Sequence, residues 1–84
     1  MTRDLHPPRI FADFHNSDPQ GRVRLNTVGT IEDLNRLGIL LQEGMAIVVS
    51  SYELEADGTV TYTNENLWAV EIDWTKVRDT SAEE

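Results

Sequence analysis

The chain contains no cysteine and only two histidines among its 84 residues. The lack of cysteine excludes disulfide bonds, zinc sites with thiolate ligands and cysteine nucleophiles. Packing and hydrogen bonds must therefore hold the fold, and a metal could bind only through histidine and carboxylate side chains. We expect no cofactor.

Basic residues are scarce as well. Seven lysines and arginines stand against fifteen aspartates and glutamates, which gives a formal net charge of -8. This charge repels phosphate backbones and favours basic partners or plain solubility, so we expect no binding to nucleic acid. Because the acids are spread over the whole chain, solubility is the simpler interpretation.

Long apolar runs are missing. No stretch approaches the roughly 18 apolar residues of a membrane span, and the start of the chain lacks the apolar core of a secretory signal. We therefore expect a cytoplasmic protein with no membrane contact. The length has room for one domain, residues 1–84, with an ordered core at about 9–77 and termini 1–8 and 79–84 that fray.

The apolar periodicity is close to two, with turn residues at short intervals, which is typical of a small antiparallel β domain. The pattern predicts a first strand over residues 9–16, a turn at 17–21 and a return strand over 22–26. Phe14 would then pair with Val23 on the core face.

A short helix is predicted over residues 31–37. Thr30 is the expected N-cap and Gly38 the expected stop, while Ile31 and Leu34 form part of a buried stripe. A helix of this length needs docking to persist, so we expect a lid over the sheet.

The longest apolar run predicts a central strand over residues 45–54, and a hairpin loop at 56–58 leads into a strand over 59–64. This register leaves Ile47 and Val49 on the face opposite the core, unless that face is also covered or a bulge shifts the register.

The last strand, residues 67–74, alternates most clearly, and Trp68, Val70, Ile72 and Trp74 should form one wall of the core. The predicted order is strand-strand-helix-strand-strand-strand. This order favours a mainly β (α+β) fold, with a small bent five-stranded antiparallel sheet or a partly open barrel.

Several runs resemble a group of small bacterial proteins of unknown function, over about residues 10–76: Leu25 to Thr30 with Asp33 and Leu34, Glu43 to Met45, and Trp68 to Trp74. Separately, Leu41 to Met45 before a β-branched strand is similar to the start of SH3-like barrels, which commonly serve as interaction modules. A helix before the long strand is not part of the usual SH3 order. Neither resemblance implies catalytic residues.

Asp13 and His15 share the solvent face of the first predicted strand, and Asp18 lies in the adjacent turn. These residues are the candidate ligands of a metal, although Arg22 and Arg24 are available as partners for the acids. A carboxylate beside a histidine also resembles acid-base machinery, but no activated nucleophile accompanies it. We therefore predict no enzyme activity.

The nominally solvent-exposed faces carry surplus apolar residues, namely Phe11, Ile47 and Val49. A contiguous apolar patch there would need a partner or the helix to cover it. The leading hypothesis is a non-enzymatic β domain that acts through protein contacts, by self-association or by docking to a larger partner. The alternative is a small-ligand or metal-binding domain that uses Asp13, His15 and Asp18.

Overall fold

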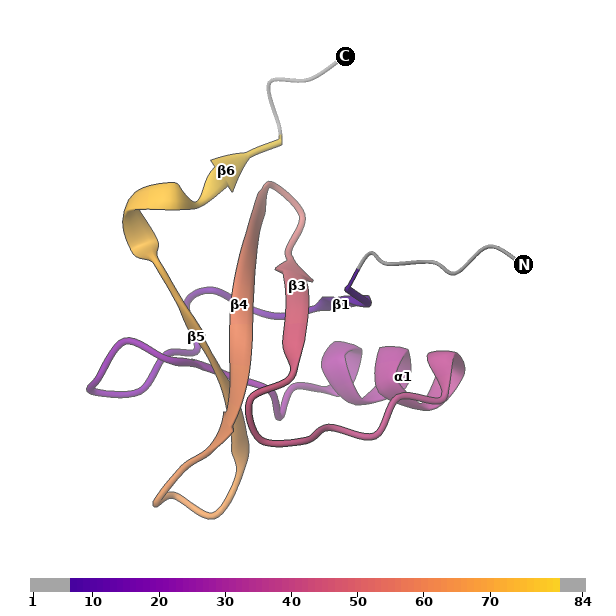
Figure 1. Cartoon of the computed structure of the whole chain (residues 1–84). Helices are drawn as coiled ribbons and strands as arrows, with labels where there is room; N and C mark the ends of the chain where they lie inside the picture. Colours follow the sequence, from indigo (N-terminus) through magenta and orange to yellow (C-terminus); the bar gives the residue numbers. More distant parts are fainter. Residues whose placement is uncertain (1–6, 81–84) are drawn as a thin grey trace.

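The protein is mainly β with one helix, and its strands form a curled open sheet that resembles half of a barrel (Figure 1). The computed structural model describes residues 7–80. Its elements in chain order are β1 (Arg9–Phe11), β2 (Val23–Arg24), α1 (Val28–Leu37), β3 (Ala46–Ser50), β4 (Leu54–Tyr62), β5 (Trp68–Ile72), the 3-10 helix η1 (Trp74–Lys76) and β6 (Arg78–Asp79). The predicted fold class is confirmed.

The strand order across the sheet is β1-β3-β4-β5-β2, with β6 paired to β4. The pairing of β1 with β3 is parallel, whereas β3, β4, β5, β2 and β6 pair antiparallel. The first two strands therefore lie at opposite edges of the sheet and do not form the predicted hairpin. Within residues 7–80, no helix is long and apolar enough to cross a membrane.

The first strand is shorter than predicted because the chain turns directly after it. Asn16 N donates to the Asp13 carbonyl at 2.9 Å, and Val23 bridges Ser17 instead of Phe14. The segment between β1 and β2 thus joins the two edges of the curled sheet, and Phe14 is buried at 5% exposure without being part of a strand.

The hairpin between β3 and β4 turns at residues 51–53, and the predicted loop at 56–58 is wrong. Ile47 lies opposite Gly58 and Val49 lies opposite Ala56, inside the sheet. A Cβ atom on Gly58 would lie 2.4 Å from Val70 Cγ2 and 2.7 Å from the Glu71 carbonyl oxygen. This glycine therefore permits close packing between β4 and β5 rather than a turn.

Because the hairpin turn lies at residues 51–53 and not at 56–58, the side chains of β3 that face the core are the opposite set from the predicted one. The side chains of Ile47 and Val49 are fully buried, on the same face as Val60, so their predicted exposure is wrong. They belong to the core, whose buried hydrophobic members are Ile10, Ala12, Phe14, Val23, Leu25, Ile47, Val49, Ala56, Val60 and Val70.

Helix α1 begins at Val28 rather than at Ile31, because Thr27 is the N-cap and its hydroxyl accepts a hydrogen bond from Thr30 N at 3.3 Å. Its predicted end is confirmed: the helix stops at Leu37, and Gly38 takes the left-handed conformation with φ of 67°.

The helix lies beside β1 and closes the edge of the sheet (Figure 1). The Thr30 hydroxyl donates to the Phe11 carbonyl at 2.7 Å, and Phe11 N donates to Asp33 Oδ2 at 2.8 Å. Both backbone groups of Phe11 are therefore satisfied by side chains of α1, which protects an edge strand from pairing with another chain. Gly29 allows the helix to approach, since a Cβ there would lie 2.8 Å from the Phe11 ring.

The wall predicted for the last strand is confirmed for three of its residues. Val70 is fully buried, and Trp68 and Ile72 are partly buried against the core. Trp74 leaves the strand for η1 and is 45% exposed. Its ring contacts Phe14 edge-on, and its Nε1 donates to the Gly21 carbonyl at 2.7 Å.

The segments expected to fray fall largely outside the described residues, which exclude 1–6 and 81–84. Where the chain ends are described, they make backbone contacts with the sheet. Val48 N donates to the Pro8 carbonyl at 2.8 Å, and Thr80 N donates to the Glu53 carbonyl at 2.7 Å.

Candidate functional site

A surface pocket of about 510 Å³ lies between the turn after β1 and the hairpin between β3 and β4. It brings together Phe11, Asp13 and His15, which sequence analysis assigned to two different hypotheses. Its lining is mostly aromatic and polar, with one aliphatic side chain: Phe11, Asp13, Phe14, His15, Ser51, Tyr52, Glu53 and Leu54.

The aromatic part of the pocket is a pair of rings. The centroids of Phe11 and Tyr52 are 5.6 Å apart, with an angle of 61° between the rings, so they meet edge to face. Phe11 is held by its two backbone hydrogen bonds to α1. Tyr52 lies in the hairpin turn and is 91% exposed.

The hairpin turn that presents Tyr52 has a local hydrogen-bond pattern. Ser51 N donates to the Leu54 carbonyl at 2.8 Å, and Ser51 Oγ accepts from Leu54 N at 3.3 Å. Thr80 N donates to the Glu53 carbonyl, which connects the turn to the chain after β6. The backbone of the turn is thus fixed while the Tyr52 ring stays in contact with solvent.

Two carboxylates line the pocket. Asp13 Oδ1 accepts from His15 N at 2.9 Å and lies 3.5 Å from His15 Nδ1, while the His15 side chain is 98% exposed. Within residues 7–80 the Glu53 carboxylate has no hydrogen-bond or ion-pair partner. None of the residues that line the pocket is lysine or arginine, so its charged surface is acidic.

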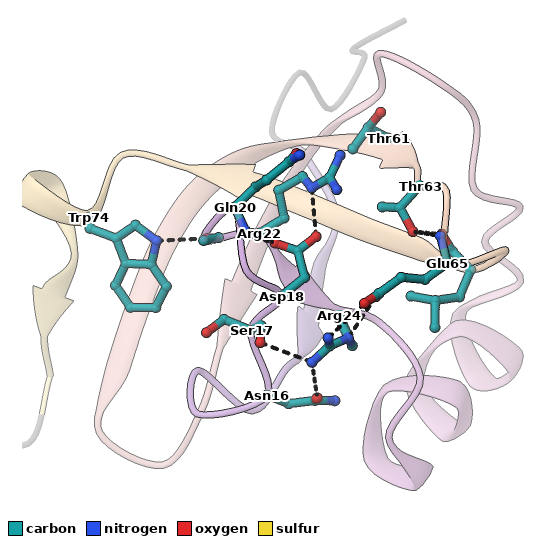
Figure 2. Close-up of polar contacts among 12 residues, drawn as sticks. Asn16, Ser17, Asp18, Gln20, Arg22, Arg24, Thr61, Thr63, Glu65 and Trp74 are labelled. Atoms are coloured by element: carbon teal, nitrogen blue, oxygen red, sulfur yellow. Dashed lines mark hydrogen bonds and ion pairs between the residues drawn. The ribbon is translucent and has the colours of Figure 1, made fainter.

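Asp18, the third predicted metal ligand, lies in a separate site. Its side chain is 1% exposed, and its oxygens accept from Gln20 N, Arg22 N and Arg22 Nε at 2.9, 2.9 and 2.7 Å (Figure 2). Burial would raise the pKa of Asp18, but these hydrogen bonds and the Arg22 charge hold that pKa below its ordinary value. The carboxylate fixes the loop before β2.

The predicted trio of metal ligands therefore does not assemble. Asp13 and His15 lie at the pocket, whereas Asp18 is committed to Arg22. In the described part of the chain, no three side chains of the types that bind metals come together.

Arg24 holds a second polar cluster, next to that of Asp18 and Arg22 (Figure 2). Its guanidinium donates to both oxygens of Glu65 at 2.8 Å, and also to the Ser17 carbonyl at 2.9 Å. The hydrogen bonds from Arg24 lower the pKa of Glu65, and burial opposes them only in part. Both arginines that could have neutralised Asp13 are therefore paired elsewhere.

Three residue types of a hydrolytic triad line the pocket, namely Ser51, His15 and Asp13. An activated serine needs a hydrogen bond to its base. Among residues 7–80 no hydrogen bond joins Ser51 to His15; the serine hydroxyl instead accepts from Leu54 N. The arrangement of these three side chains therefore lacks the geometry of an activated nucleophile.

No family model, curated protein or solved structure matches this chain. The fold and the pocket define a small α+β half-barrel with an open aromatic and acidic site.

The sequence pattern does not single out Tyr52, because residues 45–54 are predicted to form the central strand. The hairpin turn at residues 51–53 instead leaves this side chain exposed. The available signal was Ser51, a residue type that favours turns, directly before the tyrosine.

Proposed function

We propose that this chain is a non-enzymatic protein-binding domain and that a partner protein docks into the pocket between residues 13–15 and 51–54. The observation that carries the proposal is Tyr52, a large aromatic side chain that is 91% exposed in a fixed turn and contacts the Phe11 ring. Aromatic residues of this kind are enriched at the energetic centres of protein interfaces.

The fold itself gives no reason for an aromatic residue at this position. A turn at the end of a hairpin favours small polar residues, and a solvent-exposed ring contributes little to the core. Leu40 is also highly exposed, at 81%, but it does not line this pocket. The similarity of Leu41 to Met45 to the start of SH3-like barrels agrees with a role as an interaction module.

The alternative is a small-ligand or metal-binding domain that uses Asp13, His15 and Asp18. It has weaker support because the Asp18 carboxylate already accepts three hydrogen bonds. Asp13 and His15 alone would leave most positions around a metal to water or to a ligand. An unchanged melting temperature after addition of zinc or manganese would count against this alternative.

Site-specific photo-crosslinking in cells of the source organism tests the proposed function. The photoreactive amino acid p-benzoylphenylalanine replaces Tyr52 in one variant and Tyr62, a 51% exposed tyrosine on β4, in the matched control. We expect an adduct of one discrete mass at position 52 only, reduced by an excess of the unlabelled protein. Adducts of equal yield at both positions, or none at position 52, would contradict the proposal.

The mass of the adduct also separates two kinds of partner. Docking to another protein gives the mass of the chain plus that partner. Self-association gives twice the mass of the chain and would replace the docking proposal by a homo-oligomer.

A further inference from the structure

We propose that the pocket accepts an arginine side chain of the partner protein, with its guanidinium against the Tyr52 ring and paired with the Glu53 carboxylate. This inference rests on the proposed function and names the chemistry of the docked residue. Three features of the described residues support it: the charge of the pocket, its aromatic pair and the use of arginine elsewhere in the chain.

The charge of the pocket favours a cation. Asp13 and Glu53 line it without any lysine or arginine, and the whole chain carries a formal net charge of -8. Within residues 7–80 the Glu53 carboxylate has no partner, so it can pair with an incoming group without breaking an existing contact. A basic partner is also steered toward an acidic domain during encounter.

The aromatic pair favours a planar cation. A guanidinium group can lie over the face of a tyrosine ring and donate two parallel hydrogen bonds to one carboxylate. A lysine ammonium is compact and strongly hydrated, so it gains less from stacking and cannot make the paired contact. The volume of about 510 Å³ lies within the usual range of binding pockets, roughly 300–1,000 Å³.

The chain also pairs arginines with several of its own carboxylates. Arg22 pairs with Asp18, Arg24 with Glu65, and Arg36 with Asp33, each with its closest nitrogen-oxygen distance at 2.7 or 2.8 Å. Glu55 is likewise paired with Arg9 and Arg78. Glu53, two residues from Glu55 and beside an exposed aromatic ring, lacks such a partner, and the docked arginine would supply it.

Nuclear magnetic resonance titration of the full chain with short peptides tests the inference. The probe is acetyl-Gly-Arg-Gly-amide, and two analogues carry citrulline or lysine in place of arginine. Citrulline has nearly the shape of arginine without its charge. We expect shifts of the backbone amides of residues 13–15 and 51–54, with binding about tenfold weaker for citrulline and about threefold weaker for lysine.

Matched variants separate site-specific binding from the general acidity of the chain. Tyr52→Leu and Glu53→Gln should each weaken binding of the arginine peptide about threefold to tenfold. Tyr62→Leu and Glu32→Gln make the same chemical changes at an exposed tyrosine of β4 and an exposed acid of α1, and should leave binding within twofold. Amide spectra of all four variants should match that of the wild-type protein outside the substituted site, which checks that each variant remains folded.

Equal binding of the arginine and citrulline peptides would overturn the inference, as would equal effects of Glu53→Gln and Glu32→Gln. Binding of lysine as tight as that of arginine would also overturn it. If crosslinking at position 52 still captures a partner in these cases, the proposed function stands and only the arginine assignment fails. If crosslinking fails while the arginine peptide binds as expected, the pocket binds guanidinium groups but the docking proposal fails.

Discussion

The wall formed by β3, β4 and β5 and the rim of the pocket differ in what their side chains contact. In the wall, Ile47, Val60 and Val70 are fully buried against other strands. On the rim, Tyr52 is 91% exposed and the His15 side chain 98% exposed. Packing determines the residues of the wall, whereas the fold places few demands on the rim, so rim residues are free to serve binding.

Phe11 connects the two regions. Its backbone is tied to α1 by Thr30 and Asp33, while its ring contacts Tyr52 at the pocket. We therefore expect substitutions to cost most stability in the wall, less in the loops and edges that close the sheet, and least on the rim.

The largest expected effect is that of Gly58→Ala in the wall. The added Cβ would lie 2.4 Å from Val70 Cγ2 and 2.7 Å from a backbone oxygen, so the strands must move apart. We expect a loss of about 3 kcal/mol in the free energy of unfolding, measured by urea denaturation. Thr59→Ala, at the exposed neighbouring position, is the control and should cost much less. Equal denaturation midpoints for the two variants would contradict the packing account.

Asp18→Asn should have the next largest effect, because it weakens the buried hydrogen bonds that fix the loop between the sheet edges. We expect a loss of about 2 kcal/mol at pH 7. Asp13→Asn is the control: it makes the same change on the rim, where the side chain is 47% exposed, and should cost about 0.5 kcal/mol or less.

The pH dependence of the stability of Asp18→Asn tests separately whether the charge of the Asp18 carboxylate stabilises the fold. The pKa of Asp18 is lowered in the folded state, so its contribution to stability is present above the unfolded pKa of about 3.9. That contribution is lost as the pH falls below 3.9 and through the lower folded pKa. The wild-type protein should therefore lose more stability than Asp18→Asn on acidification from pH 5 to pH 2. Parallel pH profiles would show that the carboxylate charge has no such role.

Substitutions at the edge of β1 should have intermediate effects. Thr30→Val keeps the shape of a fully buried side chain but leaves the Phe11 carbonyl without its donor, and we expect a loss of about 1–2 kcal/mol in the free energy of unfolding. Thr30→Ser retains the hydroxyl and should recover part of that loss.

Hydrogen exchange tests the second contact between α1 and β1, in which Phe11 N donates to Asp33 Oδ2. Asp33→Ala removes the acceptor of Phe11 N and should speed exchange of that amide, whereas Arg36→Ala leaves the acceptor in place. Equal exchange rates at Phe11 in the two variants would mean that α1 does not protect the edge through this contact.

Sequence periodicity predicted the class of fold, the end of the helix at Gly38 and the burial of Val70, because alternation and helix stops depend on neighbouring residues. The hairpin between β3 and β4 was predicted at the wrong place. Asp57 and Gly58 have the composition of a turn. Glycine is needed at position 58, however, because a side chain there would clash with Val70, which lies on a different strand, β5.

That single error changed the prediction of the site. Moving the hairpin turn to residues 51–53 reverses which side chains of β3 face the core, because side chains alternate with a period of two. Ile47 and Val49 were therefore predicted to be exposed, and Tyr52 was predicted to lie in the sheet. Phe11, Asp13 and His15 were identified from their local pattern, but their meeting with Tyr52 depends on the parallel pairing of β1 with β3, for which the sequence carries no local signal.

Tyr52→Ala on the rim should have the smallest effect on the free energy of unfolding. This variant tests most directly whether a rim residue stabilises the fold. An aromatic side chain that serves the fold costs several kcal/mol on truncation, typically about 3–5 when it is buried. Because Tyr52 is 91% exposed, against 51% for Tyr62, we expect its truncation to change the free energy of unfolding by about 0.5 kcal/mol or less in urea denaturation. Tyr62→Ala is the matched control: its ring is 5.0 Å from that of Trp68, so truncation should cost about 1 kcal/mol. A loss at Tyr52 as large as at Tyr62 would mean that the ring stabilises the domain, and the main reason for assigning it to a binding surface would disappear.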